Sequence, residues 1–415
     1  MRTGKIMKQY VIIGGGVASV GCIEGIRSID KESKIVLVSG EGRPVYCRPL
    51  ISYYLQGKTD LEKMKYRPDE FYTENNCEIL YEKAEKIDPD EHSVTLSSGK
   101  KISYDALCIA TGSTPFIPAF EGIESVQSKF TFMTEDDALA LESAVKADSR
   151  VLIIGAGLIG LKCAEGLSGR VGSITVCDLA TRVLSSILDD ECASVMQAKL
   201  EENGIKFLPG DSAVKFDKNT AVMKSGKEID FDVLVLALGV RPNISLISDI
   251  GGSTGRGIIV DTSMRTSIPD IYAAGDCAQG YDASLGDSRI LAILPSAVMQ
   301  GGCAGVNMAG GSQTLNDNIP MNAIGFFGLH ALSAGSYDGE MFEYKDGQNI
   351  KRLFVKDGHL IGFMMIGDIR SAGIYTSLIR NKTPLDSVDF ELLKKNPSFS
   401  AFSSEIRRKK LGGVV

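Results

Sequence analysis

A short apolar run followed by a glycine-rich turn occurs twice in this chain, and this repeat restricts the possible folds more than any other feature. The two copies span residues 10–19 and 151–160, and each is followed by a helical pattern and a second β-branched run, at 34–38 and 173–178. A strand, a helix and a second parallel strand form the βαβ unit. The sequence therefore predicts an α/β fold with two domains that contain parallel sheets.

Both turns carry the small residues that a dinucleotide-binding turn needs. The first glycine makes the tight turn, the second lets a pyrophosphate approach the backbone, and the third lets helix and strand pack closely. Free amides at the start of the helix and the helix dipole favour an anion there. A glycine-rich turn can also bind nothing, but two copies, each between a strand and a helix, favour two nucleotide sites. The residues are Gly155, Gly157 and Gly160 in the second copy and Gly14, Gly16 and Ser19, a small residue in place of the third glycine, in the first.

An acidic residue at the end of the second strand of such a unit binds the ribose hydroxyls. Asp178 ends the run 173–178, and Glu41 is the matching candidate after the first copy. Because a carboxylate repels a 2′-phosphate, Asp178 favours NADH over NADPH, although Arg182 lies nearby and weakens this preference. Asp178 could instead be a solvated carboxylate at a strand end.

The C-terminal part of the chain has a different pattern. After residue 315 the sequence has β-rich segments separated by glycine turns, and a helical pattern follows from about 371 to 380. This pattern predicts a third domain of the α+β type.

Charge, hydropathy and cysteine spacing argue against several classes of protein. The net charge is −7, so no positive field attracts nucleic acid or an anionic membrane. The sequence lacks both an apolar run of about 18 residues and a signal peptide, so we expect a cytoplasmic protein without a membrane segment. The nine cysteines form no CxxC pair, and the three histidines are dispersed, so we expect neither a vicinal redox disulfide nor a metal site.

Five stretches together resemble one known family. They are residues 14–19, 46–52, 110–112, 155–160 and 271–276. Through them the chain resembles the FAD-dependent pyridine nucleotide-disulfide oxidoreductases over nearly its whole length. The branch it resembles contains NADH:rubredoxin reductase, the flavoprotein part of NADH-dependent nitrite reductase, and related NADH oxidases.

This resemblance implies a fold of the glutathione-reductase type, with two Rossmann-like dinucleotide-binding domains and a C-terminal α+β domain. It places FAD on the first glycine turn and NAD(P)H on the second. The FAD-binding domain is then discontinuous, at 1–120 and 243–314, the NAD(P)H-binding domain spans 121–242, and the C-terminal interface domain spans 315–415. In the family the last domain is usually a dimer interface, so we expect a homodimer.

The resemblance also assigns single residues to the cofactors. Asp276 is expected at the ribityl chain or the flavin-side phosphate of FAD, and Arg48, followed by Pro49, in the flavin region. Gly239 ends the strand from which the chain returns to the FAD-binding domain, and we expect it beside NADH. Read from the residues alone, Asp276 could be a helix N-cap and Arg48 a surface arginine. The adenine half of FAD is assigned to Ala84, Ala110, Thr111 and Gly112.

One departure from the family concerns a charged pair beside the flavin. Members often carry a lysine directly after the Arg-Pro-x-x-Ser run and a glutamate on the NADH-domain helix. Here Tyr53 and Lys162 occupy these two positions. Our hypothesis is that Lys162 supplies the positive charge that stabilises reduced flavin. The alternative is an ordinary residue on the helix surface.

Cys47 is the candidate for thiol chemistry, because some members use a single cysteine beside the flavin. Aligned through Tyr46, Arg48 and Pro49, however, Cys47 stands about three residues too early, and the Ser-x-x-Ser-Cys-Gly context is missing. We therefore expect a small structural residue rather than a redox-active one.

The resemblance implies an FAD-dependent NAD(P)H oxidoreductase that moves a hydride from NADH to N5 of FAD. We expect the electrons to pass to a small redox protein such as rubredoxin or to a partner subunit. One alternative is a single-cysteine NADH oxidase, peroxidase or coenzyme A disulfide reductase that uses Cys47. Another is the NAD-coupling flavin subunit of a multi-subunit oxidoreductase, whose partners would supply any iron–sulfur cluster. A third is a redox-sensing flavoprotein of the apoptosis-inducing factor type.

Overall fold

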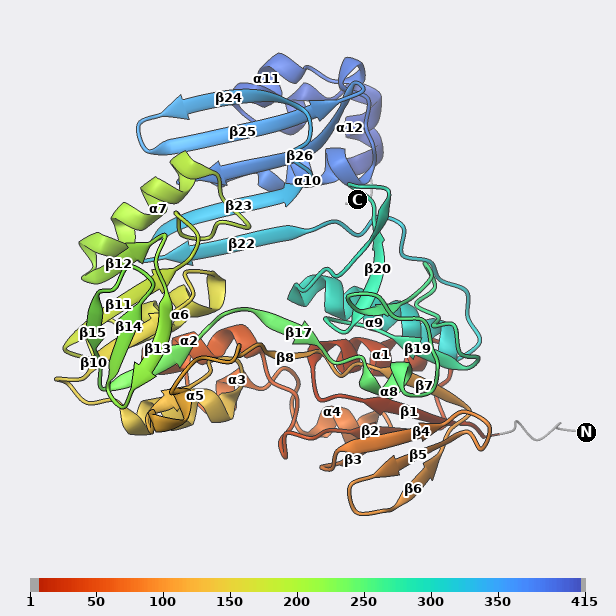
Figure 1. Cartoon of the computed structure of the whole chain (residues 1–415). Helices are drawn as coiled ribbons and strands as arrows, with labels where there is room; N and C mark the ends of the chain where they lie inside the picture. Colours follow the sequence, from red (N-terminus) through yellow and green to blue (C-terminus); the bar gives the residue numbers. More distant parts are fainter. Residues whose placement is uncertain (1–6, 412–415) are drawn as a thin grey trace, which may run out of the picture. The chain divides into compact units, whose positions relative to one another are not determined.

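A computed structural model describes residues 7–411 of the chain (Figure 1). Residues 1–6, part of the N-terminal segment in which the sequence predicts no signal peptide, lie outside the described residues. The contacts divide the chain into two compact units. The first contains residues 1–48, 60–114 and 240–318, and the second contains 49–59, 115–239 and 319–415. The segment 49–59 therefore groups with the second unit, although it follows Arg48 directly.

The first unit is built on a five-stranded parallel sheet with the order β19-β7-β1-β2-β3. Its strands are short and apolar, and the three central ones are almost completely buried, as is usual for a parallel sheet covered on both faces. The glycine turn connects β1 to α1. The strands and the main helices are β1 (Gln9–Ile13), β2 (Lys34–Val38), β3 (Cys77–Leu80), β7 (Ala106–Ile109), β19 (Ile271–Ala273), α1 (Val17–Ile29) and α9 (Leu294–Met308).

Helices α1 and α9 pack closely because glycines line their contact. A Cβ atom added to Gly301 would lie 2.0 Å from the carbonyl oxygen of Ala18, and one added to Gly305 would lie 2.1 Å from that of Cys22. No side chain larger than hydrogen fits there without moving a backbone. This packing holds the N-terminus of α1 in place beside the sheet.

Smaller elements complete the first unit. An antiparallel sheet has the order β4-β5-β6, another three-stranded sheet has the order β18-β20-β21, and β8 pairs with β17. The bounds are β4 (Ala84–Asp88), β5 (Ser93–Leu96), β6 (Lys101–Ser103), β8 (Ser113–Pro115), β17 (Val240–Pro242), β18 (Ile258–Ile259), β20 (Ala278–Asp282), β21 (Asp287–Arg289), η1 (Arg48–Leu50), α3 (Leu61–Met64), α4 (Glu70–Glu74) and α8 (Ser245–Ser248).

The second unit contains its own parallel sheet, with the order β12-β11-β10-β16-β9. Here the glycine turn connects β10 to α6, and helix α2 packs against α5 and α6. An antiparallel sheet, β13-β14-β15, is inserted before β16. The bounds are α2 (Ile51–Leu55), η2 (Ile123–Ser125), β9 (Lys129–Phe130), α5 (Glu135–Ala144), β10 (Arg150–Ile154), α6 (Leu158–Leu167), β11 (Ser173–Asp178), α7 (Asp190–Glu202), β12 (Ile205–Pro209), β13 (Ala213–Asp217), β14 (Thr220–Met223), β15 (Glu228–Asp230) and β16 (Val233–Leu236).

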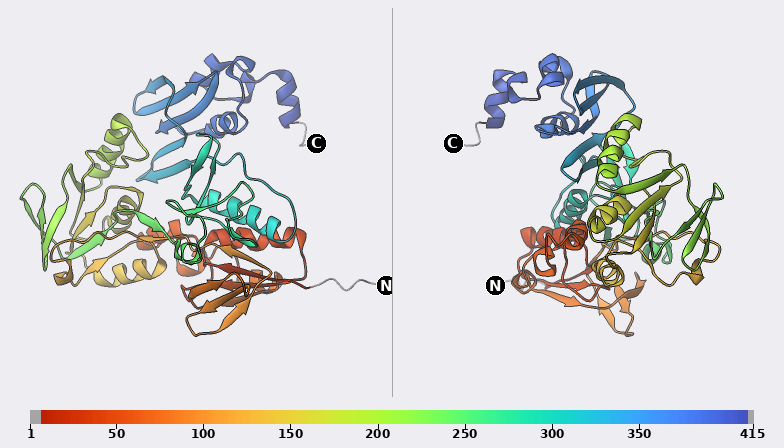
Figure 2. Two further views of the ribbon diagram at one scale, coloured as in Figure 1. Left: turned by 45° about the vertical axis from the view of Figure 1, so that its right-hand side comes forward. Right: turned by 90° about the vertical axis from the view of Figure 1, so that its left-hand side faces the viewer.

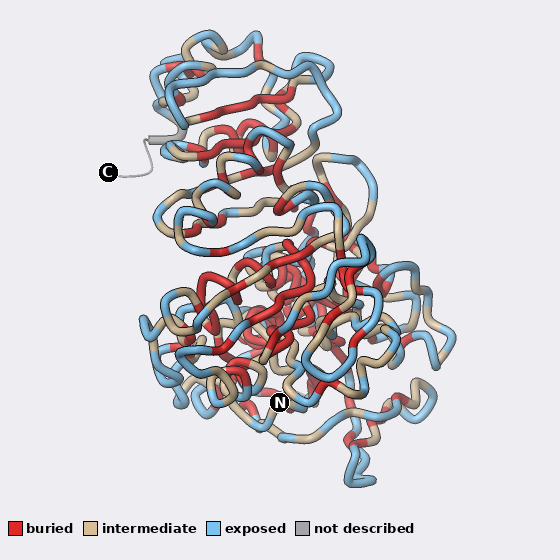
Figure 3. Tube along the Cα trace, turned by 60° about the vertical axis from the view of Figure 1, so that its left-hand side comes forward, coloured by how far each residue is buried: buried red, intermediate tan, exposed pale blue. Residues whose placement is uncertain are grey.

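The C-terminal part of the second unit is a five-stranded antiparallel sheet with the order β22-β23-β26-β25-β24. Helix α10 packs on β26 and β23, and α11 packs on β24. Figure 2 shows the blue C-terminal helices and strands in two further views. Buried positions gather on the central strands β25 and β26, whereas β24 is exposed or half-buried along its whole length. Figure 3 shows how buried and exposed positions are distributed along the whole chain. The bounds are β22 (Met321–Phe326), β23 (Leu329–Gly335), β24 (Glu340–Asp346), β25 (Asn349–Lys356), β26 (His359–Ile366), α10 (Ala372–Arg380), η3 (Leu385–Ser387), α11 (Phe390–Lys395), η4 (Phe399–Ala401) and α12 (Ser404–Leu411).

The predicted α/β fold class, with two βαβ-based parts, is confirmed. The predicted domain boundaries stay predictions. The contacts place the C-terminal part, from residue 319, in one compact unit with residues 115–239.

A cluster of charges joins this C-terminal sheet to α7. The guanidinium of Arg352 on β25, with a side chain only 9% exposed, pairs with Asp189, Glu191 and Glu343. Asp189 also caps α7, because its carboxylate accepts a hydrogen bond from the Cys192 amide. Although burial opposes it, Arg352 lowers the pKa of Asp189, and it also lowers the pKa of Glu343.

Arg352→Met should reduce the free energy of unfolding by about 2–3 kcal/mol, because it leaves three carboxylates without their shared cation. The partners are partly exposed, so the loss stays below the roughly 3–5 kcal/mol of a fully buried pair. Urea unfolding of the FAD-loaded protein measures this. Because their pKa values are lowered in the folded protein, these carboxylates stabilise the fold above the ordinary carboxyl pKa. This stabilisation is lost as the pH falls through the lowered pKa values and the carboxylates become protonated. The difference from wild type should therefore shrink below about pH 4. Lys345→Met, at an exposed position of the same cluster, is the control, and an equal loss there would contradict the argument.

Candidate functional site

The first glycine turn forms a cradle at the N-terminus of α1. Gly14 has φ +121°, and a Cβ atom there would lie 2.0 Å from the carbonyl oxygen of Ala110. A Cβ atom on Gly16 would meet nothing within 4 Å, and no side chain caps the helix. Ser19 is buried, and its hydroxyl donates to the carbonyl oxygen of Gly16 at 2.6 Å, so a small residue does fill the third position. The buried hydroxyl of Ser39 has no hydrogen-bond partner among the described residues. This open, donor-rich turn fits the pyrophosphate of a dinucleotide.

Charged residues around the first cradle are already paired with one another. The guanidinium of Arg48 pairs with Glu41, and the Tyr46 hydroxyl donates to the same carboxylate at 2.9 Å. Although burial opposes the charge of Arg48, Tyr46 and Glu41 raise its pKa. With a side chain 34% exposed and bound to a carboxylate, Arg48 is no isolated surface arginine. Glu41 therefore shares its carboxylate between Arg48 and any ribose it would bind.

Asp276 lies after β19, at the turn formed by Gly275 (φ +80°). Burial raises the pKa of its carboxyl group, while Arg48 and the Ser113 hydroxyl, 3.4 Å away, oppose this shift. No helix starts here, since strand β20 begins at Ala278, so the helix N-cap alternative is wrong. A half-buried carboxylate that faces an arginine fits a hydrogen-bonded hydroxyl group of a cofactor.

The turn Ala110–Gly112 adjoins this cradle through the contact of Ala110 with Gly14. Asn243 was missed in the sequence, and it fixes the turn. Its side-chain amide donates to the carbonyl oxygen of Thr111 at 2.8 Å. Its backbone N–H donates to the carbonyl oxygen of Gly112 at 2.9 Å. In the sequence, only the position of this polar side chain, directly after Arg241-Pro242, pointed to Asn243.

Of the other residues that the resemblance assigns to FAD, Ala84 begins β4 and Pro49 is exposed. The assignment of these residues to FAD stays a prediction.

The second glycine turn repeats this construction at the N-terminus of α6. Gly155 has φ +116°, and its added Cβ atom would lie 2.2 Å from the carbonyl oxygen of Ala237. An added Cβ atom on Gly160 would lie 2.0 Å from the carbonyl oxygen of Gly155, whereas one on Gly157 would meet nothing within 4 Å. No side chain caps α6. Gly239 follows β16 with φ +96° and open space around it. The second cradle therefore also fits a dinucleotide.

The predicted ribose ligand Asp178 is held at the end of β11. Its carboxylate accepts hydrogen bonds from the amides of Ala156 at 2.7 Å and Ala180 at 2.8 Å. Nearby, the guanidinium of Arg182 is bound to Asp190 at 2.7 Å and to the carbonyl oxygen of Leu188 at 3.1 Å. The carboxylate is thus part of the second cradle, while the arginine is occupied elsewhere.

Lys162 is not an ordinary surface residue of α6. Its ammonium donates to Glu165 at 2.7 Å and to the carbonyl oxygen of Gly325 at 2.6 Å, and it lies 4.5 Å from the ring centre of Phe326. Glu165 in turn accepts from the amide of Phe327 at 2.9 Å. The Lys162–Glu165 pair therefore links α6 to the hairpin of β22 and β23, a connection that local sequence patterns did not indicate.

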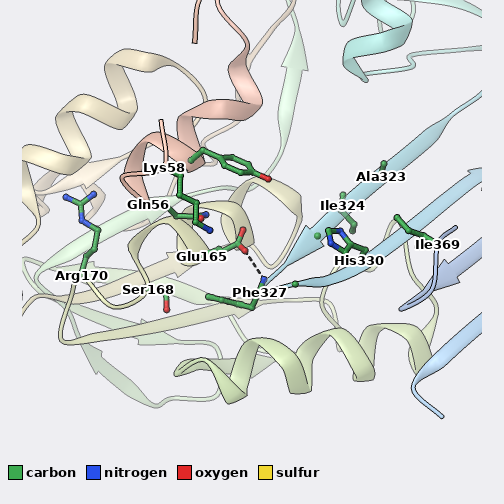
Figure 4. A pocket seen from close by; sticks show the side chains of 13 residues that line it. Gln56, Lys58, Glu165, Ser168, Arg170, Ala323, Ile324, Phe327, His330 and Ile369 are labelled. Atoms are coloured by element: carbon green, nitrogen blue, oxygen red, sulfur yellow. Dashed lines mark hydrogen bonds between the residues drawn. The ribbon is translucent and has the colours of Figure 1, made fainter. Parts of the chain in front are cut away.

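A cavity of about 590 Å³ opens beside this pair (Figure 4). Tyr53 lines it, and its ring centre lies 5.8 Å from the Lys162 ammonium. Figure 4 shows Gln56, Lys58 and Glu165 on one side of the cavity and His330 on the other. The two residues that replace the charged pair of the family are thus neighbours within the second unit.

The nine cysteines are free thiols, and all are buried except Cys47, which is half-buried. The amide of Cys47 donates to the carbonyl oxygen of Met64 at 2.8 Å. Burial raises the pKa of the Cys163 thiol and brings that of Cys77 to about 12. Within residues 7–411 no group of side chains is arranged to hold a metal ion, and no helix there is long and apolar enough to span a membrane.

Known proteins match the chain over most of its length. Residues 8–301 match the family described as pyridine nucleotide-disulphide oxidoreductase. The NADH-dependent phenylglyoxylate dehydrogenase subunit epsilon of Aromatoleum evansii is 30% identical, and the match covers 91% of this chain and 92% of that protein. An NADH oxidase of Methanocaldococcus jannaschii is 33% identical, with 88% of each chain covered.

A solved structure agrees with these matches. NADH:rubredoxin oxidoreductase from Clostridium acetobutylicum superposes with a TM-score of 0.74 at 26% identity, over 92% of this chain and 95% of that one. The family predicted from the sequence is therefore confirmed. Each unit also contains one glycine turn at a helix that no side chain caps. The chain is therefore an FAD-dependent NAD(P)H oxidoreductase that belongs to the pyridine nucleotide-disulphide oxidoreductase family.

Proposed function

We propose that this protein oxidises NADH and delivers the electrons through FAD to a protein acceptor, either a small redox protein or a partner subunit. The observation that carries the proposal is the pair of glycine cradles, with a carboxylate at the strand end of the second. Bound FAD accepts a hydride and can release electrons singly, which a nicotinamide cannot. One similar protein is named for its partner rubredoxin, and another is named as a subunit of an NADH-dependent dehydrogenase.

The residues of the chain bind and orient the two nucleotides in this proposal. The α1 cradle would hold the pyrophosphate of FAD, and Asp276 a hydroxyl of its ribityl chain. Arg48 pairs with Glu41, and the charge of Asp276 also raises its pKa, so it would hold these two carboxylates in the flavin region, where the resemblance places it. The α6 cradle would hold the pyrophosphate of NADH, with Gly239 beside it. Proximity of the two bound rings supplies most of the rate.

NADH is the proposed donor because of the second cradle. Asp178 is fixed by two amides, so a 2′-phosphate would meet an anion that cannot turn away. Arg182 is bound to Asp190 and does not compensate for this charge.

Asp178→Ala should raise the KM for NADH by about tenfold, as expected when a charge-assisted hydrogen bond to the ribose is lost. The preference for NADH over NADPH should fall, because the repulsion is removed as well. Steady-state kinetics with both nucleotides and an artificial one-electron dye measure this. Asp217→Ala, at an exposed position of β13, is the control and should leave the KM for NADH within about twofold. An unchanged preference in the first variant would contradict the role of Asp178.

Lys162 is proposed to tune the flavin with its positive charge. Lys162→Met should then lower the flavin reduction potential. A shift of about 30 mV corresponds to about 1.4 kcal/mol for a two-electron couple. Spectroscopic redox titration of the holoenzyme measures the potential. Because Lys162 also neutralises Glu165, the double variant Lys162→Met, Glu165→Gln separates the two effects. An unchanged potential in both variants would leave Lys162 with only its link to the β22–β23 hairpin.

The acceptor is tested with a panel of oxidants. NADH oxidation would be measured with oxygen, coenzyme A disulfide, rubredoxin and a one-electron dye, in wild type and Cys47→Ser. The proposal expects fast turnover with rubredoxin and dye, slow turnover with oxygen and coenzyme A disulfide, and no effect of the substitution. Fast oxygen or disulfide turnover that is lost in Cys47→Ser would favour the single-cysteine alternative. The M. jannaschii relative, named an NADH oxidase, makes the oxygen measurement necessary.

We also propose a homodimer formed through residues 315–415, as the family resemblance implies. Light scattering of the purified protein would contradict it by giving the mass of one chain. A cytoplasmic location stays a prediction from the sequence.

A further inference from the structure

The residue that directly follows β2 carries a hydroxyl group without a partner. Ser39 is 1% exposed, and its Oγ atom forms no hydrogen bond with any of the described residues. A Cβ atom added to Gly15, the central residue of the first glycine turn, would lie 2.2 Å from this oxygen. The hydroxyl therefore lies against the turn. A buried polar group without a partner costs free energy, and a ligand that supplies the partner removes this cost.

The internal repeat identifies the counterpart of Ser39 in the second cradle. In both cradles the amide of the first glycine donates at 2.8 Å to the carbonyl oxygen of one strand residue, which is Val38 in the first cradle and Cys177 in the second. The next residues along the chain are Ser39 and Asp178. These two residues therefore occupy equivalent positions.

Both positions also contact the same part of their turns. The central residue of the second turn, Ala156, donates its amide to Asp178 at 2.7 Å. Ser39 lies against Gly15, the central residue of the first turn. Asp178 has the position in which a βαβ unit binds the ribose of its dinucleotide. Ser39 has the same position in the first cradle, with an uncharged hydroxyl in place of a carboxylate.

Glu41, the carboxylate that the sequence favours for this ribose, is already bound. Arg48 pairs with it, and the Tyr46 hydroxyl donates to it at 2.9 Å. Ser39, in contrast, has no hydrogen bond to lose among the described residues. A serine hydroxyl changes rotamer about one bond and offers one donor and two acceptor lone pairs. It can therefore turn from Gly15 toward a ribose hydroxyl without breaking another contact.

We propose, building on the proposed function with FAD in the first cradle, that Ser39 binds a hydroxyl group of the adenosine ribose of FAD. Glu41 then serves as the counter-ion of Arg48 and not as the ribose ligand. The position equivalent to Asp178 is uncharged in the first cradle, so the two cradles bind their riboses with different chemistry.

Ser39→Ala should raise the Kd for FAD by about three- to tenfold, because one hydrogen bond between uncharged groups is lost. Serial dilution of the holoenzyme, with the fluorescence of released FAD as readout, measures the Kd. The matched control is Ser93→Ala, which removes another buried hydroxyl without a partner among the described residues, on β5 of the same unit. It should leave the Kd within about twofold. Equal Kd values of wild type and a folded Ser39→Ala protein would overturn the proposal.

FAD analogues that lack the 2′- or the 3′-hydroxyl of the adenosine ribose identify the group that Ser39 binds. They are loaded into each holoenzyme by exchange against an excess of the analogue. We expect the effect of Ser39→Ala on the Kd to disappear with one of the two analogues, and the effect of Glu41→Gln to be the same with FAD and both analogues. An effect of Ser39→Ala that is equal with all three cofactors would overturn the proposal. An effect of Glu41→Gln that disappears with one analogue would assign the ribose to Glu41 and overturn it as well.

Failure of the proposed function gives a different result. A wild-type protein that binds no FAD would overturn both the proposed function and the role of Ser39. A Ser39→Ala protein that has the wild-type Kd, and whose flavin NADH still reduces, would overturn the ribose contact alone.

Discussion

Gly16→Asp should give a folded protein that does not bind flavin. The backbone of Gly16 is extended, with φ −105° and ψ 177°, and an added Cβ atom meets nothing within 4 Å, so the free protein can accept the side chain. The new carboxylate would occupy the space at the N-terminus of α1 where the FAD pyrophosphate is expected. Like charges placed together cost several kcal/mol, so FAD affinity should fall at least about 100-fold. Visible flavin absorbance after purification and after reconstitution measures this, and circular dichroism checks the fold.

Retention of wild-type flavin by Gly16→Asp would place FAD somewhere other than on α1. A colourless but unfolded protein would instead mean that the turn tolerates no side chain, and Gly16→Ser would then replace it with a smaller, uncharged group. Serine keeps the charge of the site unchanged, so its flavin content should lie between those of wild type and Gly16→Asp.

Gly157→Asp should give the reciprocal result, a yellow protein that NADH no longer reduces at ordinary concentrations. Gly157 is also extended, with φ −79° and ψ −176°, and has the same open space at the start of α6. The Kd for NADH should rise at least about 100-fold for the same electrostatic reason. Rapid mixing of NADH with the anaerobic holoenzyme measures the rate of flavin reduction, and dithionite should still reduce the flavin fully.

These two variants control for each other, because the same substitution is made at equivalent positions of two similar turns. A loss of flavin in Gly157→Asp, or normal flavin reduction by NADH in it, would contradict the assignment of one nucleotide to each cradle.

The parts of this molecule that sequence could predict are those encoded by neighbours along the chain. The glycines of both turns, the strand that Asp178 ends and the helix near 371–380 follow from local patterns, and the structure has α10 at Ala372–Arg380. Close approach of Gly14 to Ala110 and of Gly155 to Ala237 explains why no other residue fits those two positions.

The parts that sequence could not predict depend on partners far apart in the chain. Lys162 contacts Gly325, and Arg352 contacts Asp189, each across more than 160 residues. Local patterns carry no information on such pairs, because the partners meet only after the sheets have formed. Lys351 shows the same limit. Lys351 and Arg352 are adjacent on β25, and both charged side chains are buried. Two adjacent charges in a strand would be expected to place at least one side chain in solvent.

The most direct measurement is anaerobic rapid mixing of the purified, FAD-loaded wild-type protein with NADH. The account predicts that the visible flavin absorbance disappears in a fast, NADH-dependent phase and returns when an acceptor protein or a one-electron dye is added. A flavin that stays oxidised under saturating NADH, or a polypeptide that cannot be reconstituted with FAD at all, would contradict it.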